Sequence, residues 1–435
     1  MKYKVNSPLK KKIIKRVKFL LCGYESTNKN YYPMKVETSV SAILSEISGI
    51  GKCQLKFMVE IIKLFLSLRG RYTYLNFARY GNFPEQYYRR HFGACFDFKS
   101  LNMSLIKAHC SANRSDLIWI FDPSHISKSG KHTPGVGYFW SGCAGAAKWG
   151  LELCGLALGD MFHHTAMHYH AMHTGKPKDE QKLLAYYAGI LVKQSAELKK
   201  TSATIVVDAF FSKREFVDAL VKSGMKVISR LRKDAYLRYA YIGPQKSGRG
   251  RKKTIGEKID VFKPLPAHFK ETKRTQDEVL YEGIAHVRAL KRWCKVTIMH
   301  VIKDGKAKNA VIYFSTDKTT ADGALYPKYR LRFQIEFLYR DAKQFTGLEQ
   351  SQSRQKKALD FHVNLSLSVI NIAKVLHWFK IPKDERQAFS MADIKTQYIN
   401  ELLLDKLIAI YGKDPNVEKN NPEIKKLYQI GKIAA

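Results

Sequence analysis

The spacing of apolar residues predicts a helical first part, a mixed central part and a helical end. At 57–68, apolar residues recur every three or four positions, which predicts an amphipathic helix. Residues 72–92 predict two further helices joined by a turn at Gly81–Pro84, because proline favours the first turn of a helix. From position 115 the apolar runs become short and rich in β-branched and aromatic residues, which predicts strands. These runs are 117–121, 151–158 and 165–173.

The central part then alternates between the two periods. Helical spacing at 179–200 and 212–224 is interleaved with short apolar runs at 204–207 and 226–231. Strands that come first and then alternate with helices predict a mixed α/β sheet. Further along the chain we expect alternating strands over 280–316, a long and mostly buried helix over 359–379, and a helix that Ser390 and Asp393 begin as a capping box and that ends near Gly412.

The charge balance is strongly basic, with 75 Lys and Arg against 38 Asp and Glu and a formal net charge of +37. Such a surface attracts polyanions, and nucleic acid is the first candidate. Ribosomal and structural RNA-binding proteins share this composition, so charge alone does not select an activity. Residues 1–20 carry eight Lys or Arg and no acid. They are interpreted as a DNA-binding arm or as a solvated tail.

Two other basic segments are candidate DNA contacts. Arg89 and Arg90 lie on the second helix of 72–92, which suits a DNA groove as a helix-turn-helix but suits an ordinary helical bundle equally well. The Gly- and Lys-rich stretch within 240–275 is expected to be an exposed loop. Its candidate DNA-binding residues are Arg249, Arg251, Lys252 and Lys253.

Cysteine usage and apolar run length bear on the compartment. The seven cysteines are scattered, odd in number and without a CxxC pair, which indicates reduced thiols in the cytosol. The apolar runs fall short of the ~20 residues of a membrane span. We therefore expect a cytoplasmic protein with no membrane partner.

Two aspartates each follow a predicted strand. Asp122 ends the run 117–121, and Asp208 ends 204–207. Strand ends are where an α/β sheet presents side chains to a ligand. Taken singly, either aspartate is more simply a turn-former or a cap.

Four polar residues share one stripe of a predicted helix. Tyr329, Arg332, Glu336 and Lys343 are three, four and seven positions apart, so at about 100° per residue they project in nearly one direction. A carboxylate flanked by two cations and a phenol suits phosphates and a metal ion better than a hydrophobic core. The alternative without a function is that Tyr329, Arg332 and Lys343 are solvated partners of Glu336 and Asp341.

The spacing Y-x2-R-x3-E-x6-K resembles the YREK signature of the insertion-sequence-four group of bacterial DDE transposases. Residues 315–317 (STD), 341–354 (DAKQFTGLEQSQSR) and IVVDAFFSKREF around Asp208 are also similar to that group. The resemblance covers about 115–380. It implies that Asp122, Asp208 and Glu336 are the catalytic triad, and that Tyr329, Arg332 and Lys343 contact DNA phosphates near the cleaved strand.

The resemblance implies metal-dependent DNA phosphoryl transfer. The three carboxylates would be the metal ligands for two Mg²⁺ or Mn²⁺ ions, because hard oxygen ligands with open positions favour these ions. The implied partners are the transposon ends and target DNA, with a homodimer in the synaptic complex. The implied setting is the bacterial cytoplasm, associated with the nucleoid.

The expected fold class is α/β, with an RNase H-like mixed sheet core, a β-rich insertion, and N-terminal and C-terminal helical regions. The long gap between Asp208 and Glu336 resembles family members with such an insertion. The expected domains are 1–112 (helical, DNA-binding), 113–238 (catalytic core, first part), 239–314 (basic, β-rich insertion), 315–380 (catalytic core, second part) and 381–435 (C-terminal helical region).

Other features receive plainer interpretations. Trp293 in the insertion is favoured as a core residue over one that stacks on a flipped base. The histidines from His163 to His173 are expected to be half-buried strand residues, since no cysteine or carboxylate shows a zinc spacing. Lys128 and Lys131, in the glycine-rich stretch after Asp122, are either DNA contacts or part of a turn without function.

The leading prediction is a DNA transposase that binds terminal inverted repeats, cleaves the DNA and joins 3′-hydroxyl ends to a target. Two alternatives stay open: an RNase H-like nuclease without strand transfer, and a domesticated DNA-binding protein without catalysis.

Overall fold

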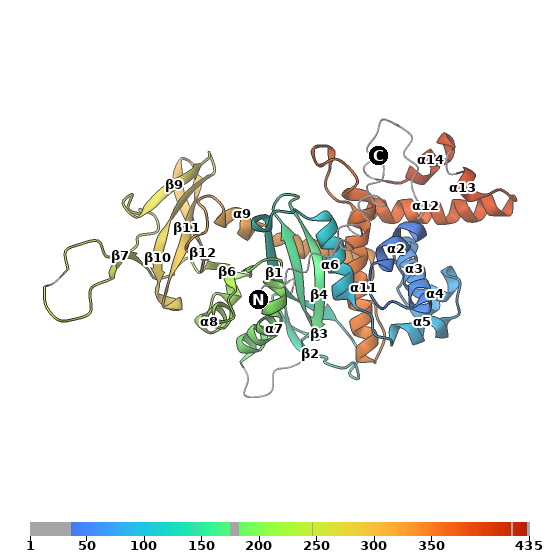
Figure 1. The fold of residues 1–435 in the computed structure, drawn as a ribbon, viewed down its shortest axis with the longest axis horizontal. Coiled ribbons are helices and arrows are strands. Elements are labelled where there is room, and N and C mark those ends of the chain that lie inside the picture. Colours follow the sequence, from blue (N-terminus) through green and yellow to red (C-terminus); the bar gives the residue numbers. More distant parts are fainter. Residues whose placement is uncertain (1–35, 143, 175–181, 246, 419–420, 433–435) are drawn as a thin grey trace, which may run out of the picture.

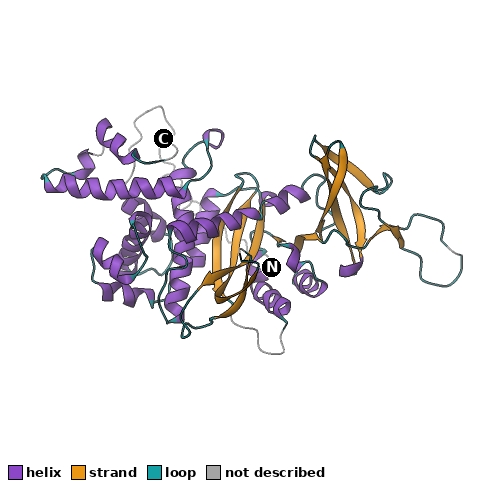
Figure 2. Cartoon of the chain, turned by 180° about the vertical axis from the view of Figure 1, so that it is seen from behind, coloured by secondary structure: helices purple, strands orange, loops and turns teal. Residues whose placement is uncertain are grey.

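The computed structural model describes residues 36–142, 144–174, 182–245, 247–418 and 421–432. The basic segment 1–20 lies outside these residues. Helices gather at one end of the molecule and the strands of the insertion at the other, with a central sheet between them (Figures 1 and 2).

The central sheet is built on five strands in the order β4-β3-β1-β5-β6. β3 runs antiparallel to both of its neighbours in this order, whereas β5 is parallel to β1 and β6 is parallel to β5. Three antiparallel strands followed by two parallel ones form the mixed sheet expected of an RNase H-like core. The strands are β1 (Leu117–Ser127), β3 (Ala146–Asp160), β4 (Thr165–His173), β5 (Thr204–Val206) and β6 (Lys226–Leu231), and β2 (Gly137–Ser141) pairs with the first part of β3.

The β-rich insertion continues the same sheet. Its last strand, β12, pairs antiparallel with β6, so that twelve strands of the described chain are hydrogen-bonded into one sheet. The predicted strands of 280–316 are confirmed as β10, β11 and β12. The strands are β7 (Leu237–Ala240), β8 (Ile255–Lys258), β9 (Phe269–Arg274), β10 (Glu278–Val287), β11 (Arg292–Lys303) and β12 (Lys306–Ser315).

Helices pack on the core sheet. The predicted helices of 179–200 and 212–224 are α7 (Leu183–Leu198) and α8 (Arg214–Lys222), and Gly224 stops α8 in a left-handed conformation at φ +82°. After β12 the chain forms α9 (Leu325–Arg330), α10 (Phe333–Phe345) and α11 (Lys356–Ala373), and a π-helical turn at Lys374–Trp378 extends α11.

α11 is the central helix of the molecule. By length and composition the stretch Lys356–Trp378 could cross a membrane, but 94% of its most apolar window is buried inside the protein. It packs against β4 on one side and against the N-terminal helices on the other. It is therefore a core helix, as its apolar composition predicts.

The terminal helices complete the helical end. They are α2 (Val36–Ser45), α3 (Lys52–Ser67), α4 (Tyr74–Tyr80), α5 (Glu85–Phe92), α6 (Phe98–His109), α12 (Met391–Ile410), α13 (Pro415–Glu418) and α14 (Pro422–Gln429). The predicted turn at Gly81–Pro84 is confirmed between α4 and α5, and the Ser390 hydroxyl caps α12 by accepting from Asp393 N at 3.2 Å. Aromatic rings such as Phe57 and Phe361, 5.9 Å apart, join the N-terminal helices to α11 in one core.

Candidate active site

Asp122 lies inside β1. The prediction that it ends the strand was wrong, because β3 pairs with β1 along its whole length and carries it on to Ser127. On its other side, β1 pairs with β5 only at Trp119 and Ile120. The pairing of β1 with β5 ends at Ile120. Asp122 therefore lies just beyond the parallel part of the sheet, with 19% of its side chain exposed.

Asp208 follows the neighbouring strand in the same register. Paired residues of β1 and β5 are 86 positions apart, as are Asp122 and Asp208. Asp208 caps a short 3₁₀ helix, Ala209–Phe211, by accepting from Phe210 N at 2.9 Å, and its own carbonyl accepts from the Ser229 hydroxyl at 2.7 Å. The turn that follows Asp208 therefore holds its carboxylate, and Ser229 of β6 holds its carbonyl.

The signature helix is divided. The four signature residues were expected on one continuous helix, but α9 ends at Arg330 and α10 begins at Phe333. Between them the hydrogen bonds tighten to a three-residue spacing, from Arg332 N to Tyr329 O and from Ile335 N to Arg332 O. The divided helix still brings Arg332 and Glu336 to the sheet edge at Asp122.

Arg332 bridges two of the carboxylates. Its Nη2 lies 2.8 Å from Glu336 Oε1, and its Nη1 lies 3.8 Å from Asp122 Oδ1. Arg332 is only 8% exposed, and its Nε is buried without a hydrogen-bond partner among the described residues. Burial acts to lower the pKa of Arg332, but Asp122 and Glu336 outweigh burial and raise it.

The other two acids act on Asp122. The pKa of Asp122 is raised to about 7, chiefly by burial, with Arg332 opposing the rise and the charges of Asp208 and Glu336 contributing to it. The structure thus brings Asp122 and Glu336 to Arg332 and places Asp208 in register on the next strand, without gathering the three acids of the described residues into one metal-holding group.

Tyr329 belongs to the same cluster. It is 6% exposed, its ring lies 4.8 Å from that of Tyr313, and its pKa is raised chiefly by burial, with Arg332 opposing and Asp208 adding to the rise. Lys343, near the end of α10, contacts β1 at a different place. Its Nζ donates to His125 O and pairs with Glu349 Oε1, both at 3.0 Å.

Tyr339 and Gly155 fix α10 on the sheet, and sequence reasoning missed both. The Tyr339 hydroxyl donates to Asp122 O at 2.6 Å. Gly155 is the residue of β3 that pairs with Asp122, and a Cβ there would meet the Tyr339 hydroxyl at 1.8 Å. A glycine inside a predicted strand was the available signal, because it often marks a close approach by another segment.

The donor set suits a hard divalent cation, since all three side chains offer carboxylate oxygens. Among the described residues, His, Cys, Asp and Glu side chains nowhere gather in threes in an arrangement that could hold a metal ion. Between Asp122 and Glu336 the position is taken by the Arg332 guanidinium. The site therefore already accommodates one positive group between two of its acids.

The other predicted DNA-binding residues lie apart from the acids. Arg89 and Arg90 are exposed on α5, where Arg89 pairs with Glu85 and Arg90 lies over the ring of Tyr87. Four more basic side chains are exposed in the loop between β7 and β8, at the far tip of the insertion (Figure 1): Arg249, Arg251, Lys252 and Lys253.

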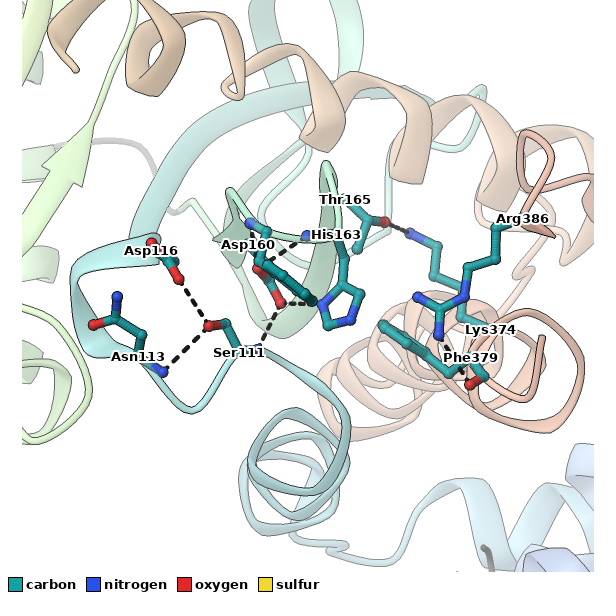
Figure 3. A network of polar contacts seen from close by, with 10 residues as sticks. Ser111, Asn113, Asp116, Asp160, His163, Thr165, Lys374, Phe379 and Arg386 are labelled. Carbon is teal, nitrogen blue, oxygen red and sulfur yellow. Dashed lines mark hydrogen bonds and ion pairs between the residues drawn. The ribbon is translucent and has the colours of Figure 1, made fainter. Parts of the chain in front are cut away.

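The remaining candidates have ordinary structural partners. The expectation of half-buried strand histidines was wrong for two of them. His163 lies in the turn between β3 and β4, with its Nδ1 2.7 Å from Asp160 Oδ2 (Figure 3), and His168 is fully buried in β4, with its Nε2 3.3 Å from Asn364 Oδ1. Trp293 is half-buried, with its ring against His286. The ammonium of Lys128 donates to two carbonyls of the loop that follows α10, those of Glu349 and Ser351.

Comparison with known proteins finds a matching family and similar solved structures. No curated protein matches the chain. Among the solved structures similar to this chain is the cryo-EM structure of a piggyBac transposase synaptic complex with hairpin DNA, at 10% identity and a TM-score of 0.36, covering 97% of this chain and 83% of that chain. Residues 131–372, more than half of the sequence, match the family model described as Transposase DDE domain. The chain therefore belongs to the family of proteins with a transposase DDE domain.

Proposed function

We propose that this protein is a DNA transposase that binds the terminal inverted repeats of its own element, cleaves the DNA there and joins the 3′-hydroxyl ends to a target. The observation that carries the proposal is the cluster in which Arg332 contacts both Asp122 and Glu336 while Asp208 stands in register on the next strand. Family membership supports it, because this family implies metal-dependent phosphoryl transfer.

The acids are proposed as metal ligands. Two divalent ions, Mg²⁺ or Mn²⁺, held by Asp122, Asp208 and Glu336, would activate the attacking oxygen and stabilise the leaving oxygen. The chain itself supplies rigidity: the open edge of β1 presents Asp122, and the Tyr339 hydroxyl ties α10, with Glu336, to the same residue. Such ties keep catalytic groups in position when DNA arrives.

The DNA contacts follow from charge and position. Arg332 is proposed to exchange its carboxylate partners for a phosphate of the cleaved strand, with Tyr329 and Lys343 beside it, because a guanidinium binds phosphate through two parallel hydrogen bonds. The basic loop at 249–253 and the exposed arginines of α5 would hold flanking DNA. A homodimer acting in the bacterial cytoplasm, associated with the nucleoid, is the proposed assembly.

The test is incubation of the protein with its element's flanking DNA and Mg²⁺, followed by detection of 3′-hydroxyl ends and of strand transfer to a second duplex. Cleavage with joining supports the transposase. Cleavage without joining favours a nuclease of the same core, and binding without cleavage favours a domesticated DNA-binding protein.

A further inference from the structure

A pocket of about 490 Å³ lies beside the candidate active site. Its walls are the outer face of α10, the turn between β3 and β4, and the segment from the π-helical turn to Phe389. Its size is within the range of small-molecule sites. The pocket has no part in the chemistry proposed above.

The turn that forms one wall is rigidly held, as Figure 3 shows. The buried carboxylate of Asp160 accepts hydrogen bonds from the backbone N–H groups of Ser111, Phe162 and His163, and it contacts the His163 ring. Four contacts to one buried acid fix the turn before any ligand arrives. The pocket is therefore preformed on this side.

Two cations in the pocket donate hydrogen bonds to neutral oxygens and form no salt bridge among the described residues, although the charge of Asp341 acts on Lys374 and that of Asp160 on Arg386. Lys374 is 5% exposed, and its Nζ donates to Thr165 Oγ1 at 3.0 Å and to Ala166 O at 2.8 Å, both uncharged oxygens. Arg386 donates to the carbonyls of Ile381 and Phe379, and its buried Nη1 has no hydrogen-bond partner among the described residues.

The charge of the pocket is unbalanced. Asp341, an acid of its wall, is buried and pairs with Arg340 at 2.9 Å. One acid of the wall, Asp341, therefore faces four cations, which are Arg340, Lys374, Lys383 and Arg386. An excess of positive charge attracts anions, so the pocket favours an anionic ligand.

Aromatic rings stand at the pocket beside these cations. Phe162 and Phe337 are 48% and 45% exposed, Lys383 Nζ lies 3.7 Å from the centroid of Phe162, and Trp378 and Phe389 complete the aromatic lining. Exposed aromatic faces combined with cations are the usual platform for a stacked base and its phosphate in single-stranded nucleic acid.

The position of the pocket connects it to the candidate active site. Glu336, which pairs with Arg332, is followed on α10 by Phe337, which lines the pocket. We propose that the pocket takes one unpaired nucleotide of the DNA strand being processed, with its base on the aromatic rings and its phosphate on Lys383 and Arg386. The assignment rests on the proposed function.

The test compares a blunt duplex of the element's end with the same duplex carrying a three-nucleotide single-stranded extension on either strand. In the parent protein the extended duplex binds about tenfold more tightly, the scale of one stacked base. The double variant Phe337→Ala/Lys383→Gln loses that preference and binds the blunt duplex as before. Phe262→Ala/Lys263→Gln removes an equally exposed pair from the insertion and keeps the preference.

A second readout does not depend on affinity. With 2-aminopurine as the first unpaired base, fluorescence falls on binding to the parent and stays high with Phe337→Ala/Lys383→Gln. Equal binding of blunt and extended duplexes by the parent, or a preference that survives in the pocket variant, overturns the inference. If a free deoxynucleotide displaces the extension at comparable concentrations, the assignment to a DNA strand is wrong.

Failure of the proposed function looks different. A parent protein that forms 3′-hydroxyl ends in Mg²⁺ but shows no extension preference loses the pocket assignment alone. A parent protein that binds neither duplex and cleaves nothing loses both.

Discussion

The contact of Tyr339 with Gly155 and Asp122 predicts a measurable coupling between α10 and the sheet. In Gly155→Ala, the new Cβ would lie 1.8 Å from the Tyr339 hydroxyl oxygen and 2.8 Å from Cζ, so the buried ring must move. Overpacking of this kind costs roughly 1–3 kcal/mol, and losing the hydrogen bond to Asp122 O adds about 1 kcal/mol. We expect the free energy of unfolding to fall by about 2–4 kcal/mol.

A double-mutant cycle isolates the contact. Tyr339→Phe alone removes only the hydrogen bond and should cost about 1–2 kcal/mol, because a buried carbonyl loses a donor. In the double variant the closest clash disappears with the hydroxyl, so the combined loss should fall short of the sum by at least about 0.5 kcal/mol.

Urea unfolding of the metal-free full chain, followed by circular dichroism, measures each loss. Gly189→Ala is the matched control, because a Cβ at that helical position meets nothing within 4 Å and should be neutral or stabilise α7. A Gly155→Ala protein as stable as its parent, or strictly additive losses in the double variant, would refute the close contact.

Three further predictions concern catalysis, binding and pH. Glu336→Gln should abolish 3′-hydroxyl formation in Mg²⁺ yet leave binding to the transposon end intact in a gel shift. Arg332→Ala should weaken that binding by about tenfold, because one charged hydrogen bond is lost. If Glu336→Gln cleaves like the parent, the assigned chemistry is wrong. DNA affinity should fall with salt at a log–log slope of about −0.9 per neutralised phosphate, less steeply when the basic side chains of 249–253 are replaced, and a flat slope would contradict phosphate-dominated binding. Burial lowers the pKa of Lys395 from 10.5 to about 7. The unfolded chain therefore binds more protons between these values, so stability should rise with pH across that window and rise less in Lys395→Met, as urea midpoints measured at pH 7 and pH 9.5 would show.

Much of the fold follows from local patterns. The strand 226–231 and the turn at Gly81–Pro84 were predictable because period-two runs and turn-forming residues act over a few positions. The extent of β1 was not, because its continuation past Asp122 depends on β3, a partner some thirty residues farther along the chain. Pairing between distant segments overrides the local signal that an aspartate gives.

The approach of Arg332 and Glu336 to Asp122 was predictable, but the contacts that support it were not. The spacing of Arg332 and Glu336 indicated that they face one way, and the structure brings both to Asp122. The two residues between α9 and α10, Leu331 and Arg332, are neither proline nor glycine, so the local sequence did not predict a break there. The role of Tyr339 also depends on tertiary packing, since a tyrosine at that position reads equally well as an ordinary core residue.

The junction of β6 and β12 has a mechanical consequence. The chain leaves the core through β6 and returns through β12, and the two strands are paired directly, from Ile312 with Leu231 to Ser315 with Ile228. Ser229, within that pairing, also holds the carbonyl of Asp208. A force on the insertion would therefore load this hydrogen-bonded ladder in shear. The pairing joins the insertion to the core directly beside Asp208, one of the proposed metal ligands.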